Sequence, residues 1–193
     1  MKAAEHKNSR HRWIFLALLF AAGVVVYLPA LRAQYLLDDY LHASMIDGTF
    51  PAKRDPLNLY DFVNETDRPA LLERGMLPWW SHPRLKIRFF RPLPSALLWA
   101  DHRLFGRGPL LLHLHSLLWW LAAALAAQKL FRRFLAPRTA RFATIVFALA
   151  PCHALPLAWL ANREALVSLS LGTLALDAYV RWREERGVRH ATI

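Results

Sequence analysis

The sequence has 193 residues, of which 55% are hydrophobic, and its formal net charge is +11. Nucleic acid is excluded as a partner, because the basic residues do not form one continuous patch but flank long uncharged apolar runs. The single cysteine, Cys152, excludes an intrachain disulfide and a cysteine-based zinc site.

The first apolar run, residues 13–31, follows a basic tail of residues 1–12 and predicts a transmembrane helix, because about 20 apolar residues span a bilayer as a helix. The alternative is a signal peptide cleaved near Ala33. The hydrophobic region of a signal peptide has about 7–15 residues, and this run is longer. The sequence therefore favours an uncleaved helix.

A long polar and aromatic segment follows at residues 33–107, with ten Lys or Arg and nine Asp or Glu. Seven prolines divide it, so no single long helix fits. Apolar residues near helical spacing predict short amphipathic helices within this segment.

Three further apolar runs predict membrane helices at residues 109–128, 142–161 and 165–180. Pro151 and Pro156 are expected to kink or break the second of these three runs. The last run contains Asp177, which we expect to form an exposed ion pair with Arg181, four residues later on the same helix.

Basic residues cluster in residues 1–12, 129–141 and 181–189. Short basic segments remain on the cytoplasmic side of a membrane, so we expect both termini in the cytoplasm and residues 33–107 outside. The predicted fold is all-α: a multi-pass protein of the inner (plasma) membrane. About four transmembrane helices lie in a membrane domain of residues 13–182, and residues 183–193 form a cytoplasmic tail.

Three groups of residues are candidates for chemistry, and this topology brings them all near the outer membrane face. The first is the pair Asp38 and Asp39, shortly after the first helix. Adjacent carboxylates at a membrane interface repel each other and lose hydration, and both effects raise a pKa and favour general-base chemistry. The alternative is the exposed start of a surface helix, where acidic residues favour the helix dipole.

The second group contains Arg88 and Arg91, followed by Asp101, Arg103 and His113. Guanidinium groups just outside a bilayer are suited to bind a lipid phosphate through paired hydrogen bonds. They also bind headgroups without specificity.

The third group surrounds His153, which lies in the proline-broken run. A histidine within a membrane helix is costly unless it lines a polar cavity, so a functional role is the default interpretation. His113 and His115 are two residues apart and point to different faces of one helix. Together with His153 they make a weak metal site at most, and we expect neither a metal nor another cofactor.

Taken together and in this order, these groups resemble the polytopic glycosyltransferases of the GT-C superfamily, especially the protein O-mannosyltransferase-like branch and its relatives with C-terminal tetratricopeptide repeats. The matching segments are Leu37-Asp38-Asp39-Tyr40, Phe90-Arg91-Pro92-Leu93, Asp101 before Phe105-Gly106, His113-Leu114-His115-Ser116, and Pro151, His153, Trp159 and Arg163. The chain differs at Ser116, Leu155 and Asn162, where such proteins often have Asn, Glu and Gly.

The resemblance implies transfer of a sugar from a polyprenyl-phosphate carrier, held in the membrane lipid, to an acceptor hydroxyl on the extracytoplasmic face. It implies that Asp38 is the base and that Asp39 positions the acceptor. The lipid phosphate would be bound by Arg91 and Arg163. The residues expected to line the cavity are Asp101, His113 and His153.

The chain is shorter than GT-C enzymes, which usually have about seven or more membrane helices. We therefore expect a truncated product, a fragment, or a short relative that needs a partner membrane chain. The alternative function is a small non-catalytic membrane protein, a scaffold, or an inactive fragment of such an enzyme. A transporter or channel is disfavoured, because the polar residues concentrate in one loop and not along several helices.

Overall fold

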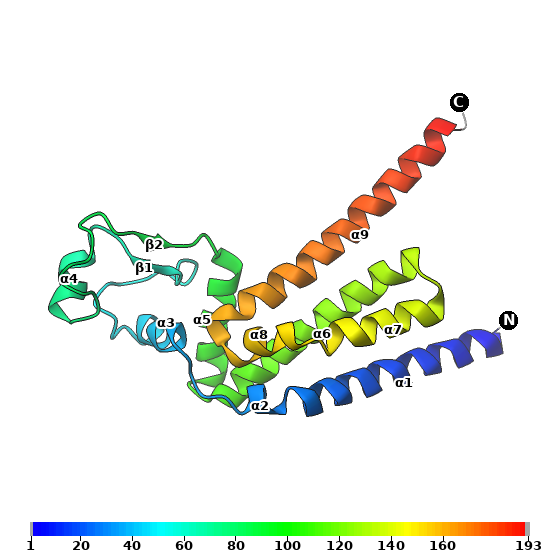
Figure 1. Cartoon of the computed structure of the whole chain (residues 1–193), viewed down its shortest axis with the longest axis horizontal. Coiled ribbons are helices and arrows are strands. Elements are labelled where there is room, and N and C mark those ends of the chain that lie inside the picture. The colour runs from blue at the N-terminus through cyan, green and yellow to red at the C-terminus, as the bar shows by residue number, and fades with distance from the viewer. Residues whose placement is uncertain (1, 192–193) are drawn as a thin grey trace.

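The structure, a computed structural model, describes the backbone of residues 2–191 and the side chains of residues 13–186. It is mostly helical, as the sequence predicts. Long helices form a bundle, and residues 33–107 form a smaller lobe at one end of it (Figure 1). We call these parts the helical bundle and the loop lobe.

The helical bundle contains α1 (Lys2–Val26), α2 (Leu28–Leu31), α6 (Pro109–Phe134), α7 (Pro137–Ala148), α8 (Ala154–Ala158) and α9 (Glu164–Ala191). Two 3-10 turns, η1 (Pro151–His153) and η2 (Leu160–Arg163), flank α8. The central helix α6 packs against both α7 and α9. It begins at Pro109 as predicted, because proline at a helix start lacks only an N–H that has no partner within the helix.

The break at the prolines is also confirmed. Helix α7 ends at Ala148, and the segment Pro151–Ala158 continues at an angle of 46° to it. Pro151 starts the 3-10 turn and Pro156 lies in α8, so the predicted single helix over residues 142–161 is in fact a bent pair.

Four transmembrane helices are not supported. In the part of the chain that the structure describes, α6 alone is long and apolar enough to cross a membrane, and the bent pair makes a second candidate if it counts as one span. The predicted helix over residues 13–31 is interrupted at Tyr27, which leaves the shorter apolar stretch Trp13–Val26 in α1. By length and composition, α6 and the bent pair are the candidate membrane spans among the described residues.

Helix α9 extends well beyond the predicted residues 165–180 and over most of the expected tail. Asp177 is fully buried, so the prediction that its ion pair with Arg181 is exposed is wrong. Arg181 does lie 3.4 Å from Asp177, but Lys129 and Arg133 of α6 approach the same carboxyl at 2.9 and 3.0 Å. Asp177 thus ties α9 to α6.

The loop lobe contains α3 (Asp38–Asp47), β1 (Asp61–Val63), α4 (Arg68–Glu73), β2 (Ile87–Arg88) and α5 (Pro92–Phe105). The short helices are as expected, whereas the strand pair is not. Strands β1 and β2 run antiparallel with an irregularity in the register, and Arg88 forms an ion pair of 3.1 Å with Asp61 across them. Strands of two or three residues are too short to show a period of two in the sequence.

Two hydrophobic cores hold these parts together. The core of the helical bundle includes Leu19, Tyr27, Leu117, Trp120, Leu157 and Leu166. The core of the loop lobe includes Phe50, Leu59, Tyr60, Phe62, Leu98 and Leu160. Leu160 belongs to η2, and the neighbouring Ala161 accepts a hydrogen bond of 2.7 Å from the Tyr60 hydroxyl. The turn η2 therefore fixes the lobe to the bundle.

Helix α1 approaches α6 closely at Gly23. A Cβ atom at this position would lie 2.1 Å from the ring of Trp120, whose indole N–H donates to the Ala148 carbonyl at 2.8 Å. Tyr27 also donates to that carbonyl, at 2.7 Å. Trp120 is thus held in place and cannot move away from an atom added at Gly23.

Gly23→Ala is therefore expected to lower the free energy of unfolding by about 1–3 kcal/mol, because overpacking a core forces side chains and backbone to shift. The matched control is Gly172→Ala in α9, where nothing lies within 4 Å of the added methyl group. That change is expected to stabilise the chain by up to about 1 kcal/mol, since glycine is a poor helix former. Thermal unfolding of both variants checks this, and equal effects would contradict the close contact.

Candidate active site

The aspartate pair lies at the first turn of α3, where the loop lobe meets the bundle. The preceding residue, Leu37, has a φ of 42°. A residue with a side chain is strained there by about 1–3 kcal/mol, and such strain persists only where the surrounding contacts impose it. The two carboxyl groups have different surroundings.

Asp39 is 3% exposed and accepts hydrogen bonds from three backbone N–H groups. These belong to Leu36 at 3.0 Å, Ala161 at 2.7 Å and Leu160 at 3.3 Å. Burial raises the pKa of Asp39, and the three hydrogen bonds oppose this shift only in part. Asp39 thus fastens the start of α3 to η2.

Asp38 is half-buried and lines an apolar pocket of about 360 Å³ in the loop lobe. Most of the pocket wall comes from Leu41, Phe50, Phe62, Leu71, Leu77 and Phe89. Burial raises the pKa of Asp38, while the positive charge of Arg91 lowers it in part. The raised pKa agrees with the sequence analysis, and its main cause is loss of hydration.

Arg91 lies at the start of α5, and a third of its side chain is exposed. Its guanidinium group forms an ion pair of 3.1 Å with Glu164 and lies over the rings of Tyr60 and Phe89, at 5.0 and 4.7 Å. The aromatic faces hold the group in place, and its exposed part is accessible to an anion.

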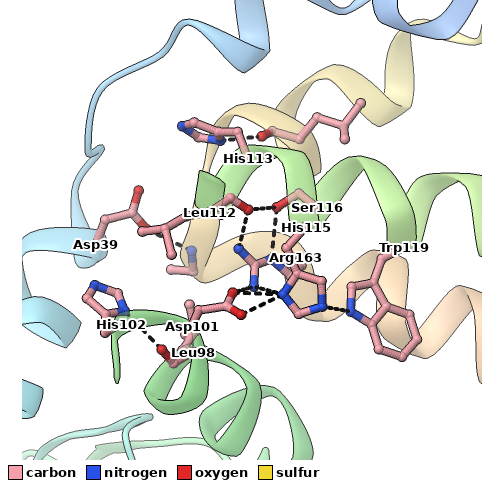
Figure 2. Close-up of polar contacts among 12 residues, drawn as sticks. Asp39, Leu98, Asp101, His102, Leu112, His113, His115, Ser116, Trp119 and Arg163 are labelled. Atoms are coloured by element: carbon pink, nitrogen blue, oxygen red, sulfur yellow. Dashed lines mark hydrogen bonds and ion pairs between the residues drawn. The ribbon is translucent and has the colours of Figure 1, made fainter. Parts of the chain in front are cut away.

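Arg163, the other expected phosphate ligand, is 2% exposed and lies inside the protein (Figure 2). Its guanidinium group pairs with Asp101 and donates to the Ser116 hydroxyl at 2.8 Å and the Leu112 carbonyl at 2.7 Å. Since a phosphate would have to displace Asp101, Arg163 is a structural cation that joins η2 to α5 and α6.

Asp101 is the centre of this polar network. Burial raises its pKa, but hydrogen bonds from His115 and Arg163, together with the charge of Arg163, outweigh burial and hold the pKa below its usual range. Asp101 also lines an apolar groove of about 490 Å³ between α1, α5 and α6, which is separate from the pocket that Asp38 lines.

His115 and Trp119 complete the network and were not expected from the sequence. The His115 Nδ1 lies 2.7 and 2.9 Å from the two carboxyl oxygens of Asp101, and the Trp119 indole N–H donates to His115 Nε2 at 3.1 Å (Figure 2). Because an indole only donates, Nε2 is the acceptor and Nδ1 carries the proton. The spacing of four residues between His115 and Trp119 is the sequence signal that indicates this contact.

His113 and His153 have structural contacts. His113 is fully buried, with Nδ1 2.8 Å from the Leu157 carbonyl and Nε2 3.1 Å from the Ala33 carbonyl. The Nε2 of His153 lies 2.9 Å from the Phe147 carbonyl. His113 and His115 do point to different sides of α6, as expected (Figure 2).

His42 is another buried histidine and lies in α3, the helix that begins at the aspartate pair. Burial lowers its pKa to about 3, and the ring packs against Tyr60 and Phe62. Because it is neutral at ordinary pH and enclosed by aromatic rings, it does not compete with Asp38 as a base. Over the described residues, no group of three His, Cys, Asp or Glu side chains is arranged to hold a metal ion.

The geometry thus separates the expected site residues into two sets. Asp38 and Arg91 are accessible, whereas Asp39, Asp101, His113, His153 and Arg163 make internal contacts.

Comparison of the chain with family models, with curated proteins and with solved structures gives no match.

Proposed function

We propose that the chain is a membrane glycosyltransferase of the GT-C type, which transfers a sugar from a polyprenyl-phosphate carrier to an acceptor hydroxyl on the extracytoplasmic face. The observation that carries this proposal is Asp38, a half-buried carboxyl with a raised pKa that lines an apolar pocket. Arg91, a partly exposed cation, is close enough to Asp38 to lower that pKa in part.

The distribution of charge supports the orientation in the membrane. The C-terminal end of α6 and the start of α7 carry Lys129, Arg132, Arg133, Arg138 and Arg141. This connection lies at the same end of the molecule as the start of α1 and the end of α9, opposite the loop lobe (Figure 1). We assign the basic end to the cytoplasm and the loop lobe to the outside, with α6 and the bent pair as the proposed membrane spans and with α1 and α9 packed beside them.

The proposed reaction needs one base and one cation. The Asp38 carboxylate takes the proton of the acceptor hydroxyl as its oxygen forms a bond to the anomeric carbon. The bond from that carbon to the phosphate oxygen breaks, and its electron pair leaves with the polyprenyl phosphate. Arg91 stabilises the negative charge that develops on this leaving group.

The other residues then have supporting roles. Asp39 positions Asp38, because its hydrogen bonds to the backbone of residues 160 and 161 fix the first turn of α3. Arg163 and Asp101 join α5, which begins beside Arg91, to the bundle. These assignments replace the acceptor-positioning role of Asp39 and the phosphate-binding role of Arg163.

The pocket beside Asp38 indicates the class of acceptor. Its walls are aliphatic and aromatic, and a sugar or a polar peptide would lose hydration there without gaining hydrogen bonds. We propose an acceptor whose hydroxyl group is attached to an apolar body.

A non-catalytic scaffold is the second candidate. It is favoured by the buried contacts of Arg163 and Asp39, which need no substrate to explain them. A scaffold needs no titrating carboxyl in the pocket, so the two candidates differ in what Asp38 does.

The test is a transfer assay with membranes from cells that make the full chain. Polyprenyl phosphate carrying a radiolabelled sugar is the donor, and long-chain alcohols are compared with oligosaccharides as acceptors. The proposal predicts labelled product above that of membranes without the chain, with the alcohols preferred. A scaffold gives no product with either acceptor.

The pH dependence of transfer follows from the raised pKa of Asp38. A base works only when deprotonated, so the rate is expected to fall on the acid side through an apparent pKa above the value of about 3.9 for an ordinary aspartate. The measurement is the rate of transfer between about pH 4 and 8. A rate that does not change with acid over this range would contradict Asp38 as the base.

A further inference from the structure

A second site lies at the end of the bundle opposite the loop lobe. There α9 diverges from α6 (Figure 1). Residues of α1, α6 and α9 line a groove of about 1040 Å³. Its apolar lining includes Leu16, Ala122, Leu125, Ala126 and Leu174. Its charged lining is Lys129, Arg132, Arg133, Asp177 and Glu184. The groove therefore combines an apolar floor with a charged rim.

The rim keeps an excess of positive charge. Asp177 is shared by Lys129 at 2.9 Å and Arg133 at 3.0 Å, and Arg133 also pairs with Glu184 at 2.6 Å. Arg132 is exposed, and no carboxylate among residues 13–186 lies within ion-pair distance of it. An anion entering the groove would therefore meet Arg132 first, with Lys129 one helical turn away.

The length of the groove favours a lipid over a further helix. The lining residues of α6 run from Ala122 to Arg133, a stretch of about 17 Å at about 1.5 Å per residue. The charged rim takes up the end of this stretch, and the apolar part, from Ala122 to Ala126, covers about 6 Å of it. A partner helix that spans the membrane would need an apolar groove several times as long, because the hydrocarbon core is roughly 30 Å thick. Trp13 at the groove is exposed, and tryptophan favours the membrane interface.

We propose that this groove binds one anionic phospholipid of the cytoplasmic leaflet. Its phosphate contacts Arg132 and Lys129, and its acyl chains lie on Leu16, Ala122 and Leu125. The inference rests on the membrane placement in the proposed function, but it does not depend on the transfer reaction. The site lies at the opposite end of the bundle from α3, the helix that begins with Asp38 (Figure 1).

The experiment measures lipid binding to the full chain in detergent by native mass spectrometry, with phosphatidylglycerol and phosphatidylcholine as probes. We expect one tightly bound phosphatidylglycerol per chain and weaker binding of phosphatidylcholine. Arg132→Gln is expected to weaken phosphatidylglycerol binding about fivefold, and Arg138→Gln, which removes the same charge from an exposed position on α7, is expected to change it little. Ala122→Phe fills the apolar floor and is expected to weaken both lipids.

Equal weakening by Arg132→Gln and Arg138→Gln would overturn the proposal, because it would mean diffuse attraction to the basic end. Equal affinity for the two lipids, or no effect of Ala122→Phe, would also overturn it. The transfer assay separates this result from the proposed function. A chain that binds phosphatidylglycerol as expected but transfers no sugar supports the lipid site and contradicts the glycosyltransferase. Transfer of sugar without selective binding of phosphatidylglycerol supports the glycosyltransferase and contradicts the lipid site.

Discussion

Asp38→Asn is expected to lower the rate of sugar transfer by about 10²–10⁴-fold, the usual contribution of a positioned general base. The substitution keeps the size and shape of the side chain but removes the group that accepts the proton. Asp38 lines the pocket, and burial has already raised its pKa, so the charged form is not needed to hold the loop lobe together. The fold is therefore expected to survive the change.

The control is Asp55→Asn in the same lobe. Asp55 is exposed, and its side chain accepts a hydrogen bond of 2.8 Å from the Leu57 backbone N–H, which an asparagine also accepts. Transfer by this variant is expected to equal that of the unchanged chain. If Asp38→Asn also transfers sugar at the full rate, Asp38 is not the base and the scaffold becomes the better account.

Arg163→Met is expected to lower the free energy of unfolding by about 3–5 kcal/mol, because removing one partner leaves a buried charge without compensation. Arg163 and Asp101 are each 2% exposed and are paired with each other. The Leu112 carbonyl and the Ser116 hydroxyl each lose one hydrogen-bond donor in the same change. Denaturant unfolding of the purified chain measures the loss.

A surface ion pair gives the matched control. Arg107 pairs with Asp47, and its side chain is 64% exposed, so Arg107→Met is expected to cost less than about 1 kcal/mol. A double change, Arg163→Met with Asp101→Leu, removes both buried charges and is expected to recover part of the loss. A single Arg163→Met variant as stable as Arg107→Met would contradict the buried network.

The dependence of stability on acid pH is an independent test of the same network. The pKa of Asp101 in the folded chain lies below its unfolded value of about 3.9, so Asp101 contributes stability above that pH. That stability is lost as pH falls through the folded pKa, where the carboxyl takes up a proton. Arg163→Met removes one cause of the low pKa and is expected to weaken this acid dependence.

The sequence predicts those features of the bundle that depend on a few neighbouring residues, such as the start or the break of a helix. Pro109 gave the start of α6, and Pro151 and Pro156 gave the bend after α7. For the aspartate pair, the sequence alone is consistent with both a catalytic role and the structural start of a helix. The structure divides the pair, with Asp38 in the pocket and Asp39 buried against η2.

The sequence alone does not predict contacts between segments that are far apart in the chain. Asp39 accepts hydrogen bonds from residues 121 and 122 positions later, and Arg163 pairs with Asp101 across 62 positions. The same limit explains Asp177, for which spacing on one helix gave Arg181 as the partner. The closer partners are on α6 and become visible only once α6 and α9 pack together.

The most direct test of the proposed glycosyltransferase is transfer measured in right-side-out vesicles, with labelled sugar on polyprenyl phosphate and the full chain compared with Asp38→Asn. The proposal predicts labelled product on the outside of vesicles with the unchanged chain, and product at the level of empty vesicles with Asp38→Asn. Product at the level of empty vesicles from the unchanged chain, or equal product from both chains, would contradict it.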